Sequence, residues 1–521
     1  MRLGLVVSLL IPLLAIGPAA ESHSANASDG DDRCSSLARA RYPDLEIISA
    51  RRVPAGPYVP AAEMTFQLPA SCRVAGVATP TKDSRVGFEL WLPDGWNGRY
   101  VQLGNGGFAG NIDQPSLANE LRRGNAAAMT DTGHKGSQFD ASWALGNPER
   151  VIDYGYRSIK VTADAARMLI NDYYGRAARR RYFIGCSNGG RQALIAAQRF
   201  PNDWDGVLAG SPALEWTKQL GAFAAIQHRL RLRPENWIPS GELPVIQRAA
   251  VAACGRSAAL GRACKVDVRK LICRGKERSD CLTRAQSSTL DLIQSGPTGF
   301  QPIGAAIPNN WDQWILNPDR DAPSDLAFAT QAFRYLVLDK PDWRVEDFDA
   351  QRDFGRVSAR EVAGYPLSNV LDADDPDLSR FQRHGGKLLL YVGWSDAVIS
   401  PLPAVTYYRK VMRRIGADRT LRFARLFVDP GMQHCQGGIA PNAFGQAWVA
   451  PALRADAGHD IRLALEHWVE HSRAPNSLIA ATYRGDRGAG GVVATQPLRF
   501  YPAPAGAVRT FAGKKRPSAQ R

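Results

Sequence analysis

Short apolar runs and amphipathic stretches alternate along both ends of the chain. Alternating apolar and polar residues, as in RVGFELWL at 85–92, predict a strand, whereas apolar residues at helical spacing predict a helix over 156–173. The predicted strands are 85–92, 99–103, 126–130, 181–185, 205–208, 387–393 and 420–428, and the predicted helices are 156–173, 190–200 and 460–472. Strands that alternate with helices indicate an α/β protein with a mainly parallel sheet.

This alternation is interrupted between about residues 214 and 384. The interval holds four cysteines, many prolines and tryptophans, and few clear strand patterns, until KLLLYVG at 387–393 restores a buried strand. The sequence therefore predicts one α/β catalytic domain with a large inserted lid. The predicted divisions are a signal peptide at 1–20, the first part of the catalytic domain at 21–213, the lid at 214–384, and the second part of the catalytic domain, with a basic tail, at 385–521.

The N-terminus has the pattern of a secretory signal peptide. Arg2 precedes an apolar stretch at 3–16, and Pro18-Ala19-Ala20 offers small residues for cleavage. The stretch is too short for a spanning helix, and no later window reaches that length. We therefore expect a protein secreted to the periplasm or the medium, with no membrane partner. Eight cysteines agree with an oxidising compartment, and Cys34 and Cys72, which flank the first ordered region, are a predicted pair.

Composition disfavours two function classes. No C-x-x-C pair occurs, and no histidine lies near the four cysteines between 254 and 281, so disulfides are favoured over a zinc site. The net charge of +15 raises the question of nucleic acid, yet arginine is scattered along the chain rather than gathered with aromatic residues on one element. We expect a basic exported protein that binds no nucleic acid.

The segment Gly185-Cys186-Ser187-Asn188-Gly189 has the G-x-S-x-G form of a nucleophile elbow, a sharp turn that presents a serine hydroxyl at the end of a strand. A pentapeptide of small residues is weak support by itself. Here a predicted buried strand precedes it and a glycine-flanked helix follows it. This context predicts Ser187 as the nucleophile rather than a serine that only caps the helix.

The base is expected late in the sequence, because chains with this fold run in the order serine, acid, histidine. His434 follows a predicted strand, in the loop DPGMQH at 429–434, and is the predicted base. The later histidines, His459, His467 and His471, lie near or on the last predicted helix. His467 and His471 are four residues apart, which is more typical of a solvated helix edge.

The acid is expected after a strand between the serine and the histidine. Asp396, in GWSD at 393–396, directly follows KLLLYVG and is the predicted partner of the far ring nitrogen of His434. A carboxylate in that position holds the tautomer and stabilises the imidazolium. Asp429 and Asp372 are the alternatives, but Asp429 is close to His434 in sequence and Asp372 lies in a loop of capping type.

A glycine-rich loop at 104–110 follows the predicted strand at 99–103. In this fold the oxyanion donors are the backbone N–H after the nucleophile and one from the loop after an early strand. Asn188 is therefore the first predicted donor and Gly106 or Gly107 the second, since a glycine lets the backbone approach the substrate. The loop lacks the lysine of a phosphate-binding loop.

Two cysteines stand beside the predicted nucleophile and base, in Cys186-Ser187 and His434-Cys435. A bond between Cys186 and Cys435 would draw the base to the serine across almost half of the sequence. A serine needs that proximity because its hydroxyl is a weak nucleophile until a base takes its proton. Two unrelated buried thiols are the alternative interpretation.

Several segments resemble the tannase and feruloyl esterase family of serine esterases, over about residues 34–483. They are GNGGFAG at 104–110, TDTGH at 130–134, GCSNGGRQAL at 185–194, FPNDWDGVLAGSPA at 200–213, GGKLLLYVGWSDAVISP at 385–401, GMQHCQGG at 431–438 and ALEHWVE at 464–470. The family arrangement of Cys-Ser, Asp and His-Cys falls on Cys186-Ser187, Asp396 and His434-Cys435. The resemblance implies an α/β-hydrolase fold with a lid, and esters of aromatic acids, such as feruloyl or galloyl esters, as small-molecule substrates.

One stretch departs from the family pattern. Lids of the family carry a calcium loop of spaced aspartates between two cysteines, whereas 254–264 here, CGRSAALGRAC, is short and has no carboxylate. Calcium is bound by several hard oxygen ligands, usually including carboxylates. We therefore expect no metal and no other cofactor, and expect Cys254–Cys264 and Cys273–Cys281 to stabilise the lid as disulfides.

The predicted function is that of a secreted carboxylic ester hydrolase whose lid supplies the pocket for the acid. The alternatives are a lidded binding protein with an inactive site, a thiol-disulfide enzyme that uses Cys186, and a hydrolase of other aromatic half-esters or of peptides. The intact triad pattern disfavours the binding protein, and the missing C-x-x-C pair disfavours the thiol-disulfide enzyme.

Overall fold

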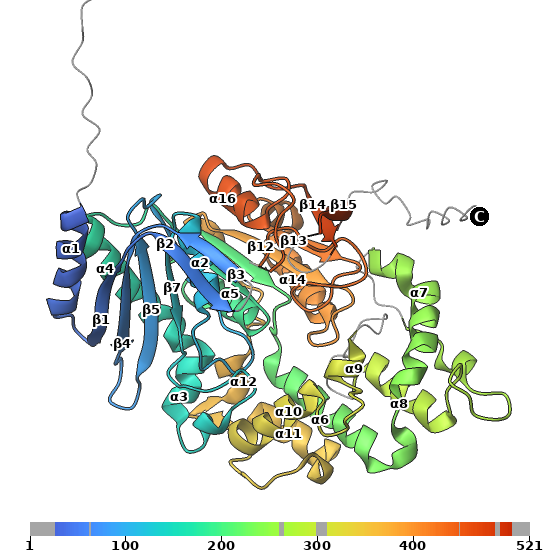
Figure 1. Cartoon of the computed structure of the whole chain (residues 1–521). Helices are drawn as coiled ribbons and strands as arrows, with labels where there is room; N and C mark the ends of the chain where they lie inside the picture. Colours follow the sequence, from blue (N-terminus) through green and yellow to red (C-terminus); the bar gives the residue numbers. More distant parts are fainter. Residues whose placement is uncertain are drawn as a thin grey trace, which may run out of the picture.

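The computed structural model describes residues 27–61, 64–259, 265–297, 310–447, 449–484 and 490–502. The predicted signal peptide, the basic tail and Cys264 lie outside these ranges. Figure 1 shows a large twisted sheet flanked by helices, with a second group of helices, coloured green to yellow, along one side of it. Within the described ranges, none of the helices has the length and apolarity needed to cross a membrane.

One sheet of eleven strands organises the molecule, in the order β1-β4-β5-β7-β6-β8-β9-β12-β13-β15-β14. The strands are β1 Leu45–Val53, β4 Ser71–Ala78, β5 Val86–Pro93, β6 Arg99–Leu103, β7 Ala126–Thr130, β8 Arg180–Cys186, β9 Gly206–Gly210, β12 Lys387–Gly393, β13 Ala424–Asp429, β14 Ser477–Tyr483 and β15 Val492–Tyr501. The run from β7 to β13 is parallel throughout, as the alternation of strands and helices predicts.

The two ends of the sheet are antiparallel, which the sequence pattern does not predict. At one end β1, β4 and β5 pair antiparallel with each other and with β7, and at the other end β13 pairs with β15 and β15 with β14. A separate hairpin, β2 Gly56–Ala61 and β3 Met64–Leu68, lies between β1 and β4 in sequence. No position of β1 is fully buried, so its apolar pattern is weak and gives little indication of a strand.

Helices cover both faces of the sheet and complete three layers. One face carries α1 Ala27–Arg39, α4 Ser158–Tyr174, α5 Asn188–Arg199 and α14 Pro401–Ile415, and the other carries α2 Gln114–Arg122 and α16 Ile461–His471. The apolar positions at helical spacing in α4, including Ile159, Ala163 and Leu169, are buried against the sheet. Burial of these stripes is the main contribution to the free energy that holds the layers together.

Between β9 and β12 the regular structure of the described residues is mainly helical, and this stretch is called the helical interval below. Its helices are α6 Trp216–Leu232, α7 Leu243–Ala259, α8 Arg284–Ser295, α9 Trp311–Trp314, α10 Ser324–Gln331, α11 Ala350–Ala359, α12 Leu367–Leu371 and α13 Ser379–His384, with one short ladder of β10 Glu361–Val362 and β11 Tyr365–Pro366. Aromatic side chains such as Trp216 and Phe328 lie in a hydrophobic core that also includes Phe108 and Trp143 from the chain before β9. Phe381 of α13 packs instead in the core of the sheet, so the chain rejoins the main layers before β12.

One predicted strand begins later than its pattern suggests. The prediction runs from Thr420, but α15 Ala417–Leu421 occupies this stretch and β13 starts at Ala424. Both the backbone N–H and the hydroxyl of Thr420 donate to the carbonyl oxygen of Gly416, at 2.9 Å each. These local hydrogen bonds favour a helical turn over the strand preference of a β-branched residue.

Candidate active site

Ser187 occupies a sharp turn between β8 and α5, at the centre of the parallel run. Its backbone is in an unusual conformation for a residue with a side chain, with φ 65° and ψ −126°. The turn can close because both flanking glycines lack side chains: a Cβ at Gly185 would lie 2.3 Å from the carbonyl oxygen of Gly189. Strain of this kind persists only where the surroundings enforce it and is common at functional sites. The conformation is that of a nucleophile elbow.

Asp396 and His434 lie at neighbouring strand ends on the same edge of the sheet. Asp396 follows β12 and His434 follows β13, and the two strands are paired up to Gly393 and Asp429. His434 Nδ1 lies 2.8 Å from Asp396 Oδ2, and the carboxylate is 1% exposed. The other oxygen of Asp396 accepts hydrogen bonds from the backbone N–H groups of Val398 and Ile399. The carboxylate is therefore held in one orientation, towards the histidine ring.

Asp429, the first alternative acid, has a different role in the structure. It is buried, and its Oδ1 accepts hydrogen bonds from the backbone N–H groups of Gly431 and Met432. These bonds shape the turn that leads from β13 to His434. Burial raises the pKa of Asp429 to about 7, and the two backbone hydrogen bonds oppose this shift.

The remaining alternative acid and the alternative bases contact other groups. Asp372 accepts hydrogen bonds from the backbone N–H and the hydroxyl of Thr217, at the start of α6, and burial raises its pKa to about 7. His459 contacts Asp456 through Nδ1. His467 and His471 are neighbours on α16, with their ring centroids 4.8 Å apart.

A disulfide joins the two loops that carry Ser187 and His434. The Sγ atoms of Cys186 and Cys435 are 2.05 Å apart and the Cα atoms 6.0 Å apart. The bond connects the residue before Ser187 to the residue after His434. In the described chain, no hydrogen bond joins the Ser187 hydroxyl to His434. Catalytic hydrogen bonds are often long in a free enzyme and tighten when substrate is bound.

The glycine-rich loop after β6 packs directly on the start of α5. A Cβ at Gly104 would lie 2.6 Å from Cα of Gly189, so any side chain there would push the loop away from the elbow. The N–H of Gly104 donates to Ile184 and that of Asn105 to Gln192 Oε1.

Three backbone N–H groups at this contact have no acceptor among the described residues. They belong to Asn188, Gly106 and Gly107, the predicted oxyanion donors. Gly107 has φ 51°, and a Cβ there would lie 2.2 Å from the carbonyl oxygen of Gln138. The loop is therefore held close to the elbow, with donors available to a ligand.

His134 holds this loop from behind, a role that the sequence does not reveal. Its Nε2 lies 2.8 Å from the carbonyl oxygen of Phe108, and its ring stacks on Trp143 with centroids 3.8 Å apart. Burial lowers the pKa of His134 to about 4, although the hydrogen bonds oppose this shift. The imidazole is therefore neutral at neutral pH and acts as part of the packing.

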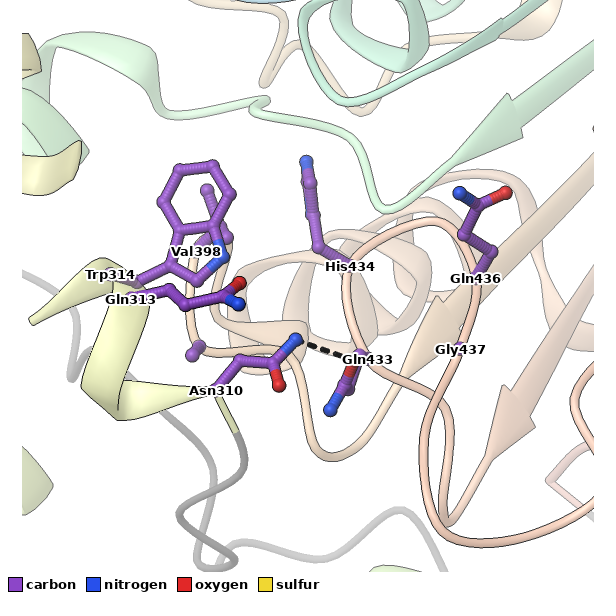
Figure 2. Close-up of a pocket in the computed structure, with 9 residues that line it drawn as sticks. Asn310, Gln313, Trp314, Val398, Gln433, His434, Gln436 and Gly437 are labelled. Carbon is purple, nitrogen blue, oxygen red and sulfur yellow. Dashed lines mark hydrogen bonds between the residues drawn. The ribbon is translucent and has the colours of Figure 1, made fainter. Parts of the chain in front are cut away.

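A cavity of about 310 Å³ opens beside His434. Figure 2 shows the indole of Trp314 and the imidazole of His434 on opposite sides of it, and their ring centroids are 6.2 Å apart. Asn310 donates from Nδ2 to Gln433 Oε1 at 2.6 Å, which connects the helical interval to the His434 loop. The lining residues are Asn310, Gln313, Trp314, Ala397, Val398, Gln433, His434, Gln436 and Gly437.

Most of these lining residues carry no sequence pattern of their own. Ala397, Val398, Gln433, Gln436 and Gly437 directly adjoin the predicted acid and base, which is the one indication that the sequence offers. Trp314 is one of several tryptophans in the helical interval. The others there, including Trp216, Trp237 and Trp311, are buried in the hydrophobic core.

The other cysteines of the described ranges are bonded and do not line this cavity. Cys34–Cys72 connects α1 to β4, and Cys273–Cys281 closes a loop of the helical interval. Cys254 is disulfide-bonded, and its expected partner Cys264 lies outside the described residues.

The residues present do not fit the calcium loop that the resemblance implies. The stretch 254–264 has no carboxylate, and across the described ranges no group of three or more His, Cys, Asp or Glu side chains is placed to hold a metal ion. Calcium requires several oxygen ligands.

The three-layer fold, with a strained serine turn at the centre of the parallel strands, defines an α/β hydrolase. The chain belongs to the tannase and feruloyl esterase family: the model of this family, "Tannase and feruloyl esterase", matches residues 72–507. It is a carboxylic ester hydrolase.

Relatives and solved structures agree with this assignment. An uncharacterized esterase of Xanthomonas campestris pv. campestris is 40% identical over 538 residues, which covers 96% of this chain and 92% of that protein. Feruloyl esterase C of Talaromyces stipitatus is 29% identical and covers 80% of this chain and 79% of its own. The crystal structure of feruloyl esterase B from Aspergillus oryzae matches with a TM-score of 0.77 at 26% identity, over 91% of this chain and 96% of that one.

Proposed function

We propose that the protein hydrolyses small-molecule esters of aromatic acids, such as feruloyl or galloyl esters, with Ser187 as nucleophile, His434 as base and Asp396 as acid. The observation that supports this most strongly is the Cys186–Cys435 bond, which places the serine and histidine loops together, combined with the 2.8 Å contact from His434 to Asp396. The substrate class rests on relatives named feruloyl esterase.

In the proposed reaction, Ser187 Oγ attacks the ester carbonyl carbon while His434 Nε2 takes the hydroxyl proton. Asp396 keeps the proton on Nδ1 and stabilises the imidazolium that forms. The carbonyl oxygen becomes an oxyanion, which accepts hydrogen bonds from the N–H groups of Asn188 and of Gly106 or Gly107.

Collapse of the tetrahedral intermediate breaks the bond to the alcohol, which leaves with the proton from His434. The acid remains bonded to Ser187. Water then attacks this acyl-enzyme while His434 takes its proton, and the acid is released as Ser187 regains its hydrogen. No cofactor takes part in this proposal.

The helical interval is the proposed lid, within the division of the chain into 21–213, 214–384 and 385–521. Asn310, Gln313 and Trp314 of this interval line the cavity opposite His434. A pocket with an indole wall and several carboxamides suits a flat ring that carries hydroxyl groups. The cleavable leader pattern at 1–20 and the disulfides support export to the periplasm or the medium.

A panel of esters tests this function. Purified protein is assayed on alkyl gallates, alkyl hydroxycinnamates, monoesters of terephthalate and the corresponding anilides, with Ser187→Ala as the matched control. We expect hydrolysis of aromatic-acid esters that disappears in Ser187→Ala, and little hydrolysis of the amides. Retained activity in Ser187→Ala, or a preference for amides, would contradict the proposal.

A further inference from the structure

Arg191 is a fully buried cation in the first turn of α5, next to the nucleophile turn. It is 0% exposed, and the hydrogen bonds of its guanidinium go to an amide oxygen and to backbone carbonyl oxygens rather than to a carboxylate. Burial lowers its pKa, although nearby groups including Asp372 oppose this shift. A buried charge without an ionic partner lowers the free energy of unfolding. The N–H donors of the guanidinium must therefore be paired with other hydrogen-bond acceptors.

The hydrogen bonds of Arg191 converge on the segments around the proposed oxyanion site. Nε donates to Asn188 Oδ1 at 2.7 Å, on the residue whose backbone N–H is the first proposed donor. Nη1 donates to the carbonyl oxygens of Gly155 and Leu371, and Nη2 to that of Tyr154. One guanidinium thus connects α5 to the turn around Tyr154 and to the end of α12.

Tyr154 extends this connection to the glycine-rich loop. Its ring lies 4.9 Å below the Arg191 guanidinium, and its hydroxyl donates to the carbonyl oxygen of Gly107 at 3.1 Å. Tyr154 is 0% exposed, so few other positions are open to its ring. The second proposed donor segment is therefore tied to the same cation as the first.

We propose that Arg191 is the positioning residue of the oxyanion site: through Asn188 on one side and Tyr154 on the other, it sets the spacing between the two groups of N–H donors. This inference rests on the proposed function, because it assumes that these N–H groups bind the oxyanion. Arg191 does not touch the reacting atoms. Its effect is to keep the N–H donors in place before the reaction. Donors preorganised in this way stabilise an oxyanion better than water molecules do.

The test compares binding of a tetrahedral oxyanion with binding of the free product acid, whose carboxylate is planar. Arg191→Met and Tyr154→Phe are assayed for kcat and KM on a chromogenic aromatic ester. Each is also assayed for inhibition by a trifluoromethyl ketone analogue, which adds Ser187 to form a hemiketal oxyanion, and by the free product acid. We expect Arg191→Met to lower kcat about 100-fold and to weaken the ketone by a similar factor, with KM and product inhibition nearly unchanged.

Tyr154→Phe removes only the hydroxyl that reaches Gly107, so it keeps the test valid if Arg191→Met does not fold. We expect a smaller loss of the same kind, and a double variant no worse than Arg191→Met, since both residues act through one connected network. Arg99→Met is the matched control: it removes an arginine with a bidentate partner, Glu470, at the opposite end of β6. It should lower the melting temperature without changing the ratio of ketone to product affinity.

Equal loss of ketone and product affinity in Arg191→Met, or unchanged kcat in both variants, would overturn the positioning role. Failure of the proposed function has a separate signature, since it would leave activity in Ser187→Ala.

Discussion

Cys186 and Cys435 are bonded to each other although they are 249 positions apart in the sequence. The bond spans the loops that follow β8 and β13, and each cysteine is the immediate neighbour of a proposed catalytic residue. Because a disulfide fixes the distance between two backbones within narrow limits, it sets how far Ser187 and His434 can separate. The main effect of the bond is therefore on the geometry of the site rather than on the stability of the fold.

Removal of this bond should therefore affect the reaction more than the fold. We expect Cys186→Ala with Cys435→Ala to fold, since the sheet and both helix layers do not depend on it, and to lose about 100-fold in kcat, because misplacing a base by ~1 Å costs about that factor. Activity and the melting temperature are measured together. Cys273→Ala with Cys281→Ala is the control, as it removes a bond in the helical interval. Equal kcat values for the two double variants would contradict this expectation.

Asp396→Asn tests whether Asp396, rather than Asp372, is the acid of the proposed triad. The amide keeps the size of the side chain but cannot stabilise an imidazolium, so kcat should fall by a factor on the order of 10⁴. Asp372→Asn is the comparison, since that carboxylate contacts Thr217 rather than His434. We expect it to retain most activity. A similar loss in both variants, in folded protein, would show that Asp396 has no special role.

Trp314 offers a test of the pocket. Trp314→Ala removes the indole that faces His434 and should raise KM for aromatic-acid esters about 10-fold, which corresponds to loss of one stacking contact. The corresponding acetate ester, which has no ring in its acid, should be affected little. Trp314→Phe retains a flat ring and should restore much of the affinity. Parallel losses for the acetate ester would show that Trp314 does not contact the acid.

The raised pKa of Asp325 predicts that the free energy of unfolding depends on pH. This residue lies fully buried in the helical interval, accepts a hydrogen bond from Gln227, and burial raises its pKa to about 8. Unfolding releases its proton when the pH lies between about 4, the ordinary pKa of aspartate, and the folded value of about 8. The unfolded chain therefore binds fewer protons than the folded one between about pH 4 and pH 8, so this group lowers the free energy of unfolding as the pH rises through that window.

Asp325→Asn has no such proton to lose. Relative to the wild type, the variant should gain stability between pH 5 and pH 8, as measured by urea unfolding at both values. Asp321→Asn removes an exposed carboxylate from the same part of the fold and reports the general effect of one charge. A difference between Asp325→Asn and the wild type that stays constant across the two pH values would contradict the burial argument.

The order of strands and helices along the centre of the sheet could be predicted from the sequence because it depends on local periodicity. The strand at β8, the helix at α5 and the buried run at β12 each carry their pattern in a few consecutive residues. Dependence on local patterns also explains the two errors in the predicted strands. β1 shows too weak an apolar pattern to indicate a strand, and the hydrogen bonds of Thr420 to Gly416 start a helical turn where β-propensity favours a strand.

The sequence by itself determined which residue types stand beside each other: a serine between small residues, an aspartate and a histidine after buried strands, and a cysteine next to two of them. Only the tertiary structure decided which loops meet, since the pairing of β12 with β13 places Asp396 and His434 on one edge. It also decided the contacts of Arg191, Tyr154 and Trp314. Their contacts come from segments distant in the chain, and neither periodicity nor spacing records such contacts, because both describe only neighbours along the backbone.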